Sequence, residues 1–257
     1  MKKYMITVRM TAENLTNGGL LYLLPGYLLR VLYLVPLLLL WRSLMSGGVD
    51  TGMTLDQMLT YTFLGTLFAS LLVVQTPASN WLYEGLIINL YQRPMGVLRH
   101  LAAQTVGGWL PDLVLFTLPM LLASPLLGVK LVTQGMTWWF VPSLLLCISL
   151  GFAVDFIFAC LTIRMKNASW VVYSIRAATI ALLSGSVIPF AILPFRLGEL
   201  FRLLPFGSLA AAPLALFVGL SEPAPTILLQ LAWNLLIWPL TLSVFARSQE
   251  WMVSHGG

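Results

Sequence analysis

Two acidic residues, Asp112 and Asp155, lie inside long hydrophobic runs of the sequence. A carboxylate in the hydrocarbon of a membrane is costly, so an acid retained there is a candidate for function. An aspartyl dyad would need both carboxylates at one depth and facing each other, which the sequence does not specify. Three interpretations stay open: structural polar contacts or helix-end positions, the lining of a transport path, or chemistry. Arg176, also in a hydrophobic run, is interpreted in the same way, as a snorkelling or paired residue or as part of a path.

Other reactive groups are sparse. Neither histidine, His100 nor His255, lies within a hydrophobic run, which argues against a serine–histidine intramembrane protease and a helical metal site. The nucleophile elbow G-x-S-x-G, the zinc motif H-E-x-x-H and the P-loop are all missing from the sequence. Cys147 and Cys160 share one apolar run and are expected to be small packing residues. We therefore expect no enzyme activity and no bound cofactor or metal.

The composition is that of a membrane protein. Hydrophobic residues make up 59% of the 257 residues and charged residues 9%, against roughly 25% charged residues in soluble domains. Several windows of about 20 apolar residues follow one another, which predicts an all-α polytopic protein rather than a β-barrel. The net charge of +5 is explained by topology and anionic lipid, so no nucleic-acid partner is expected.

The stretch 80–104 is too polar to cross a bilayer although it lies between hydrophobic runs. Spacings of three and four place one polar stripe on a helix, and Pro94 predicts a kink or break. The polar stripe comprises Asn89, Gln92, Arg93, Gly96, Arg99, His100 and Gln104. The pattern is typical of an amphipathic helix pair on the cytoplasmic membrane surface, serving either as a contact for a partner or as a plain connector.

We expect one transmembrane domain over 1–257, without a separate soluble domain. An interfacial helix is predicted over 1–19. Six membrane-spanning helices are predicted at about 20–45, 56–78, 105–127, 136–162, 170–193 and 226–246. An even number of spans places both termini on one side, which carries ten Lys and Arg residues against four on the other. The positive-inside rule then places both termini in the cytoplasm.

A proline-rich segment separates the last two predicted spans. Its prolines are Pro189, Pro194, Pro205, Pro213, Pro223 and Pro225. A short helix between two of them has an apolar face, with Arg196, Glu199 and Arg202 on the other. The segment is too apolar for a free loop and too broken for a span. It predicts a re-entrant or interfacial hairpin over 194–213 on the outer side, or a packed lid that only caps the bundle.

This arrangement resembles the ABC-2 type transporter permeases, and within them a branch of roughly 260-residue "ABC-2 family transporter proteins". The resemblance covers nearly the whole chain, but its motifs are short and degenerate. They are Glu84-Gly85 and Arg93-Pro94 in the cytoplasmic segment, then Gly185, Ile188-Pro189, Pro194 and Leu204-Pro205-Phe206.

The resemblance implies a transport subunit of an ATP-driven exporter in the cytoplasmic (inner) membrane. It implies a dimer, formed with a second copy or a similar permease, and a separate ATP-binding subunit that carries ATP and Mg. That subunit would dock on a coupling segment containing Glu84, Gly85, Asn89, Arg93, Pro94 and Arg99. Pro189, Pro194, Glu199 and Pro205 would form part of an extracellular gate.

Walls of Leu, Phe and Val with few charges suggest an amphipathic or lipid-like cargo. An ion-coupled secondary transporter that uses Asp112 and Asp155 remains an alternative, although the sequence shows no clear internal repeat. A membrane enzyme or an assembly scaffold is the other alternative.

Overall fold

The computed structural model describes residues 2–48, 51–83, 88–133, 137–165 and 169–254. All regular elements within these ranges are helices. Four helical stretches are long and apolar enough to cross a membrane: Leu21–Ser46, Val97–Leu122, Thr137–Thr162 and Pro223–Glu250. A helix needs about 20 apolar residues to cross the roughly 30 Å of hydrocarbon. The protein is therefore a helical polytopic membrane protein, as its composition predicts.

Four of the six predicted spans correspond to these long helices. They are α2 (Leu20–Ser46), the stretch made of α7 (Val97–Asp112), the π-helical turn η1 (Leu113–Thr117) and α8 (Leu118–Leu122), then α9 (Phe140–Arg164) and α13 (Pro223–Ser254). The long helix that corresponds to the third predicted span begins at Val97, eight residues before the predicted start at 105. Arg99, His100 and Gln104 therefore belong to the long helix and not to a separate surface helix.

The other two predicted spans are not continuous helices of spanning length. In 56–78 the chain forms α3 (Leu55–Leu67) and α4 (Ala69–Leu72), and it is then non-helical to Pro77 before α5 (Ala78–Tyr83). In 170–193 the helix α10 (Ser169–Leu183) ends before Ser184. At 1.5 Å per residue, the 13 residues of α3 and the 15 of α10 extend only about 20 Å.

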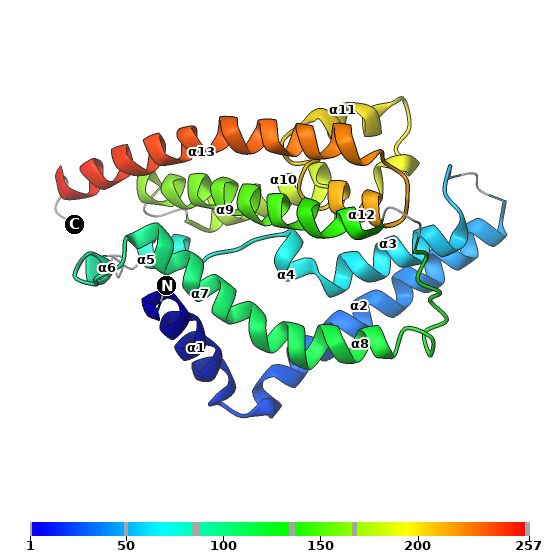
Figure 1. The fold of residues 1–257 in the computed structure, drawn as a ribbon, viewed down its shortest axis with the longest axis horizontal. Coiled ribbons are helices and arrows are strands. Elements are labelled where there is room, and N and C mark those ends of the chain that lie inside the picture. The colour runs from blue at the N-terminus through cyan, green and yellow to red at the C-terminus, as the bar shows by residue number, and fades with distance from the viewer. Residues whose placement is uncertain (1, 49–50, 84–87, 134–136, 166–168, 255–257) are drawn as a thin grey trace.

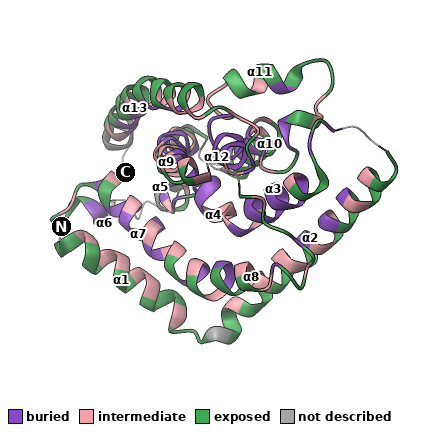
Figure 2. Ribbon diagram, turned by 45° about the vertical axis from the view of Figure 1, so that its right-hand side comes forward, coloured by how far each residue is buried: buried purple, intermediate pink, exposed green. Residues whose placement is uncertain are grey.

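The core lies around α3, α9 and α12 (Ala211–Phe217), while α1 (Lys2–Thr16), α2 and α13 form the periphery (Figure 2). α3 is buried from Met58 to Gly65, and a capping box between Thr54 and Gln57 fixes its start. α2 buries Leu34, Leu38 and Trp41 and exposes many other apolar residues. An apolar face of this kind is suited to lipid.

α9 and α13 lie side by side and run in the same direction (Figure 1). Four hydrogen-bonded pairs join them at sequence separations of 87 to 89: Ser143–Gln230, Leu146–Asn234, Ser149–Trp238 and Ala153–Thr241. A nearly constant sequence separation means that the two helices are parallel and in register. Hydrogen bonds of this kind hold helices together where lipid removes the hydrophobic driving force.

The N-terminal helix α1 lies along α7, and their contact depends on a glycine. A Cβ at Gly107 would lie 2.5 Å from the carbonyl oxygen of Val8, so a larger residue would force the helices apart. In Figure 1, α1, α5 and the C-terminal end of α13 lie toward one end of the molecule. The short helices α11 (Leu197–Leu203) and α12 lie toward the opposite end.

Candidate functional site

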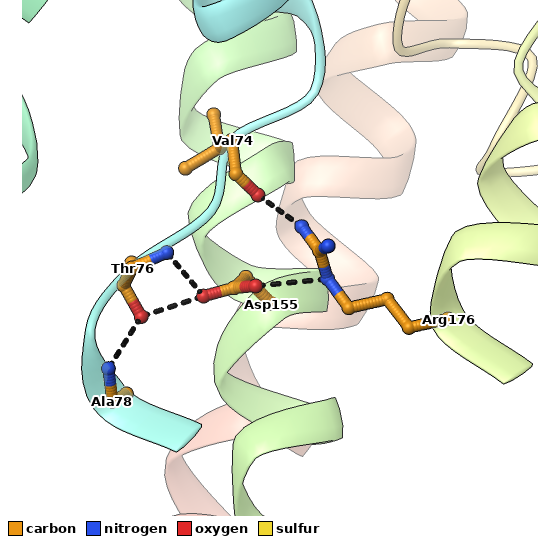
Figure 3. Close-up of polar contacts among 5 residues, drawn as sticks. All are labelled: Val74, Thr76, Ala78, Asp155 and Arg176. Carbon is orange, nitrogen blue, oxygen red and sulfur yellow. Dashed lines mark hydrogen bonds and ion pairs between the residues drawn. The ribbon is translucent and has the colours of Figure 1, made fainter. Parts of the chain in front are cut away.

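A buried ion pair between Asp155 on α9 and Arg176 on α10 forms the centre of the best-defined polar site (Figure 3). Asp155 Oδ1 lies 2.9 Å from Arg176 Nε, and the two side chains are only 2% and 6% exposed. Asp155 Oδ2 accepts hydrogen bonds from the backbone N–H of Thr76 at 2.9 Å and from its hydroxyl at 2.6 Å. Arg176 also donates to the carbonyl oxygen of Val74.

These contacts hold the non-helical segment 73–77 between α4 and α5. Pro77 has no N–H to donate, and a proline disfavours helical geometry at the residue before it, here Thr76. The segment nevertheless buries Val74 and Thr76, and buried backbone groups need partners. Asp155 and Arg176 supply a carboxylate acceptor and a guanidinium donor at this point, so the ion pair takes the place of missing helical hydrogen bonds.

A second ion pair joins Arg30 of α2 to Asp112 at the end of α7. The guanidinium Nη1 lies 2.6 Å from Asp112 Oδ1, and the Ser70 hydroxyl donates to Oδ2 at 2.7 Å. The Arg30 guanidinium carbon lies 5.2 Å from the centre of the Phe116 ring, which favours the cation. Asp112 is nearly covered, with 10% of its side chain exposed, whereas 35% of the Arg30 side chain is exposed.

The structure thus brings Asp112 and Asp155 to separate arginines and does not bring them to each other. Each carboxylate binds a cation through one oxygen and a hydroxyl through the other. A buried charge that is paired and hydrogen-bonded is stable at low dielectric, whereas a lone charge is not. Both acids and Arg176 therefore take part in structural polar contacts, and a role in a transport path remains a prediction.

Among its described residues, the stretch 80–104 is helical on both sides of a turn. α5 and α6 (Ile88–Tyr91) come first, and after the turn at 92–96 α7 begins at Val97. The break falls where Pro94 predicts one, although Pro94 precedes the first helical residue by three positions. Asn89, Arg93, Pro94 and Arg99 are exposed, while Glu84 and Gly85 lie outside the described residues. The single polar stripe predicted for this stretch is wrong at His100, which is buried with its Nε2 3.2 Å from Arg93 Nη1.

The same stretch is anchored in the core. Leu90, Val97 and Leu101 are buried in a hydrophobic cluster with Phe156 of α9 and Phe245 of α13. Tyr91 adds a polar contact with Gln249 of α13. Partial burial raises the pKa of the Tyr91 phenol, while its hydrogen bond to Gln249 acts in the opposite direction, so the group is neutral at pH 7.

At the opposite end, the proline-rich segment folds into short helices. After α10 come η3 (Phe190–Ile192), α11, a turn and α12. Of the predicted gate residues, Pro189 is buried, Pro205 is half-buried, and Pro194 and Glu199 are exposed. The segment is held to α3 by a hydrogen bond of 2.7 Å from the Tyr61 hydroxyl to the carbonyl oxygen of Gly185. Backbone packing is close, because a Cβ at Gly198 would lie 2.1 Å from the carbonyl oxygen of Phe190.

Sequence reasoning missed several polar residues of these contacts. Thr76 and Ser70 complete the two carboxylate sites, and Gln230 bonds Ser143 and the carbonyl oxygen of Ser208 inside the bundle. Arg30, which lies in the first predicted span, binds Asp112. The available signal was charge balance, since two arginines and two aspartates within hydrophobic runs must find partners.

Comparisons of the chain with protein-family models, with curated proteins and with solved structures found no match.

Proposed function

We propose that this chain is the membrane-spanning permease subunit of an ATP-driven exporter of the ABC-2 type, which it resembles in sequence. In this proposal the chain crosses the membrane six times. The four long helices make four crossings. The other two combine a short helix with a non-helical stretch: α3 and α4 with residues 73–77, and α10 with the residues that follow it.

The contacts of the non-helical stretches support this topology. Irregular backbone at membrane depth is tolerated only where protein satisfies its polar groups. Asp155 and Arg176 do this for 73–77, and Tyr61 bonds the Gly185 carbonyl oxygen beyond α10. Arg30 and Arg176 lie in ion pairs and are best left out of the charge count. Eight cations then remain on the side of the termini against four on the other, which still favours cytoplasmic termini.

One observation carries the proposal: a single short stretch both presents cations outward and reaches the core. Arg93, in the turn after α6, and Arg99, in the first turn of α7, are exposed. Figure 1 shows α5 and α6 toward the end of the molecule where α1 begins. Between and beside the two arginines Leu90, Val97 and Leu101 pack against α9 and α13. A partner ATPase bound at the exposed residues would therefore move residues that pack directly on two long helices.

The ion-coupled alternative is less well supported, because it requires a carboxylate that can bind and release an ion. Asp112 and Asp155 are each bound to an arginine and a hydroxyl. Opening the Asp155–Arg176 pair would leave two buried charges without their counter-ions, which is costly. Opening the Arg30–Asp112 pair would leave the nearly covered Asp112 carboxylate alone, which is also costly.

The test is purification of the tagged chain in mild detergent, followed by identification and ATPase assay of copurifying proteins. A P-loop ATPase should copurify with the wild type and with the control Arg196→Glu, which reverses an exposed charge at the opposite end. It should be lost from Arg93→Glu, while the chain still inserts and remains monodisperse. Recovery of the chain alone, with transport driven by a proton or sodium gradient in vesicles, would overturn the proposal.

A further inference from the structure

Two hollows in the described part of the bundle meet at Arg30. One, of about 660 Å³, lies between α1, α7 and the segment 73–77. The other, of about 350 Å³, lies between α2, α3 and the residues after α10. Arg30, Ala69 and Val73 line both, so the hollows are neighbours that share a wall. Both volumes are within the roughly 300–1,000 Å³ typical of ligand pockets.

The hollows differ in chemistry. The larger is rich in hydroxyl and amide side chains, among them Ser70, Gln75, Thr76, Asn80, Gln104 and Thr105. The smaller is mainly apolar, with Leu29, Leu37, Leu72 and Val187 among its lining residues. A hollow with many polar side chains beside a mainly apolar one matches a molecule with a polar head and a hydrocarbon chain.

Their order along the bundle matches the orientation of such a molecule in a membrane. Thr11 and Leu15 of the N-terminal helix line the polar hollow. The apolar hollow lies farther along α2, at Tyr33, faces Thr62 and Gly65 of α3, and extends to Ser186. A head group beside α1 would thus direct its chain along α2, between α2 and α3.

The charge at the junction indicates the sign of the head group. Of the Arg30–Asp112 pair, the cation lines both hollows and is the more exposed partner. Arginine has five N–H donors, and the contact with Asp112 Oδ1 uses the Nη1 group. The remaining donors suit the oxygens of a phosphate or carboxylate, which arginine binds in a bidentate manner.

We propose that these two hollows form one binding site for an amphiphile with a phosphate or carboxylate head group, whose head binds Arg30 in the polar hollow and whose chain occupies the apolar hollow. Arg30 is the recognition residue. Asp112, with Ser70 and Phe116, positions its guanidinium. The claim that cargo is loaded at this site rests on the exporter function proposed above, whereas the claim that the site binds such an amphiphile does not.

Binding is measured by calorimetry on the full chain in maltoside micelles, with oleoyl lysophosphatidic acid as probe. Monoolein, which has the same chain without the phosphate, is the matched probe. The lysophosphatidic acid should bind at least about tenfold more tightly than monoolein, the difference expected for losing one charge-assisted hydrogen bond. Arg30→Gln should abolish this difference. Asp112→Asn, which frees the guanidinium, should enlarge it.

Two further variants keep the test decisive. The double variant Arg30→Gln with Asp112→Asn removes both charges, so a loss of phosphate preference in it cannot come from an unpaired buried carboxylate. Arg42→Gln removes the other arginine of α2, which bonds the carbonyl oxygens of Leu127 and Gly128, and should leave binding unchanged. Equal affinity for both probes in the wild type, or an unchanged preference in the double variant, would overturn the site.

A second arm separates resident lipid from cargo. The complex with its ATPase is reconstituted into phosphatidylcholine vesicles that contain the labelled probe, and probe in each leaflet is followed with ATP. Binding with ATP-dependent movement supports both proposals. Binding without movement retains the site, as a lipid site, and argues against export. Absence of binding overturns the site whatever the ATPase does.

Discussion

Breaking the ion pair between Asp155 and Arg176 tests whether these residues stabilise segment 73–77. Asp155→Leu leaves the Arg176 guanidinium without its counter-ion in a site that is almost fully buried. Removal of one partner from such a pair costs about 3–5 kcal/mol. The Thr76 N–H also loses its acceptor, which adds about 1–3 kcal/mol. We expect the variant to lose most of the stability of the bundle.

The decisive measurement is whether the double variant Asp155→Leu with Arg176→Met is more or less stable than the wild type. Replacement of an ordinary buried ion pair by apolar residues is often neutral or stabilising by about 1–4 kcal/mol. Here it would also remove the partners of the Thr76 N–H and the Val74 carbonyl. Because each orphaned backbone group costs about 1–3 kcal/mol, we expect the double variant to be less stable than the wild type.

Stability is measured by titration of the detergent-solubilised protein with dodecyl sulfate, with helicity followed by circular dichroism. Glu13→Gln, which breaks the exposed Arg9–Glu13 pair on α1, is the control and should have no measurable effect. A double variant as stable as the wild type would refute the support of the backbone by this pair. A stable Asp155→Leu variant would refute the pair itself.

Three further predictions follow from the packing. Gly198→Ala should destabilise the proline-rich segment by about 3 kcal/mol and expose it to limited proteolysis, because the added Cβ would overlap the Phe190 carbonyl oxygen. The control Gly26→Ala adds a Cβ in open space on α2 and should be neutral or stabilising. Gln230→Leu should lower the stability by about 2 kcal/mol in the dodecyl sulfate titration, because the Ser143 hydroxyl and the Ser208 carbonyl oxygen lose their partners. An unchanged midpoint would contradict the role of these hydrogen bonds in joining α9 to α13. Leu90→Ala should leave the ATPase bound in the pull-down but reduce its stimulation, since the exposed Arg93 remains while the anchor in the core is lost; full stimulation would argue against coupling through Leu90.

The sequence predicts the helical class and four long helices because both depend on local composition. Hydropathy over about 20 residues marks α2, α7–α8, α9 and α13, and Pro94 marks the break before α7. Non-local contacts are not encoded in this way. Arg30 and Asp112 are 82 residues apart, and hydropathy says that each needs a partner without indicating which one.

The non-helical segment 73–77 also depends on contacts that the local sequence does not reveal. Val73 and Val74 are apolar enough to extend the helix that precedes them, and Pro77 signals only an end to the helix. Whether the backbone unwinds earlier depends on the acceptor and donor that Asp155 and Arg176 provide from two later helices. Likewise, α12 is buried because it packs on α9 and α3, although its sequence also fits a lid on the surface.

Segment 73–77 connects the features considered above. Its residues Gln75 and Thr76 line the polar hollow at Arg30, and Thr76 is bonded to Asp155. The segment continues directly into α5, which opens the stretch that presents Arg93. A non-helical segment bends at lower cost than a helix, because no i to i−4 hydrogen bonds have to break. The buried ion pair therefore holds a non-helical part of this route in place. If the stretch 80–104 moves as the proposed function requires, that movement would reach the hollow only by working against the pair.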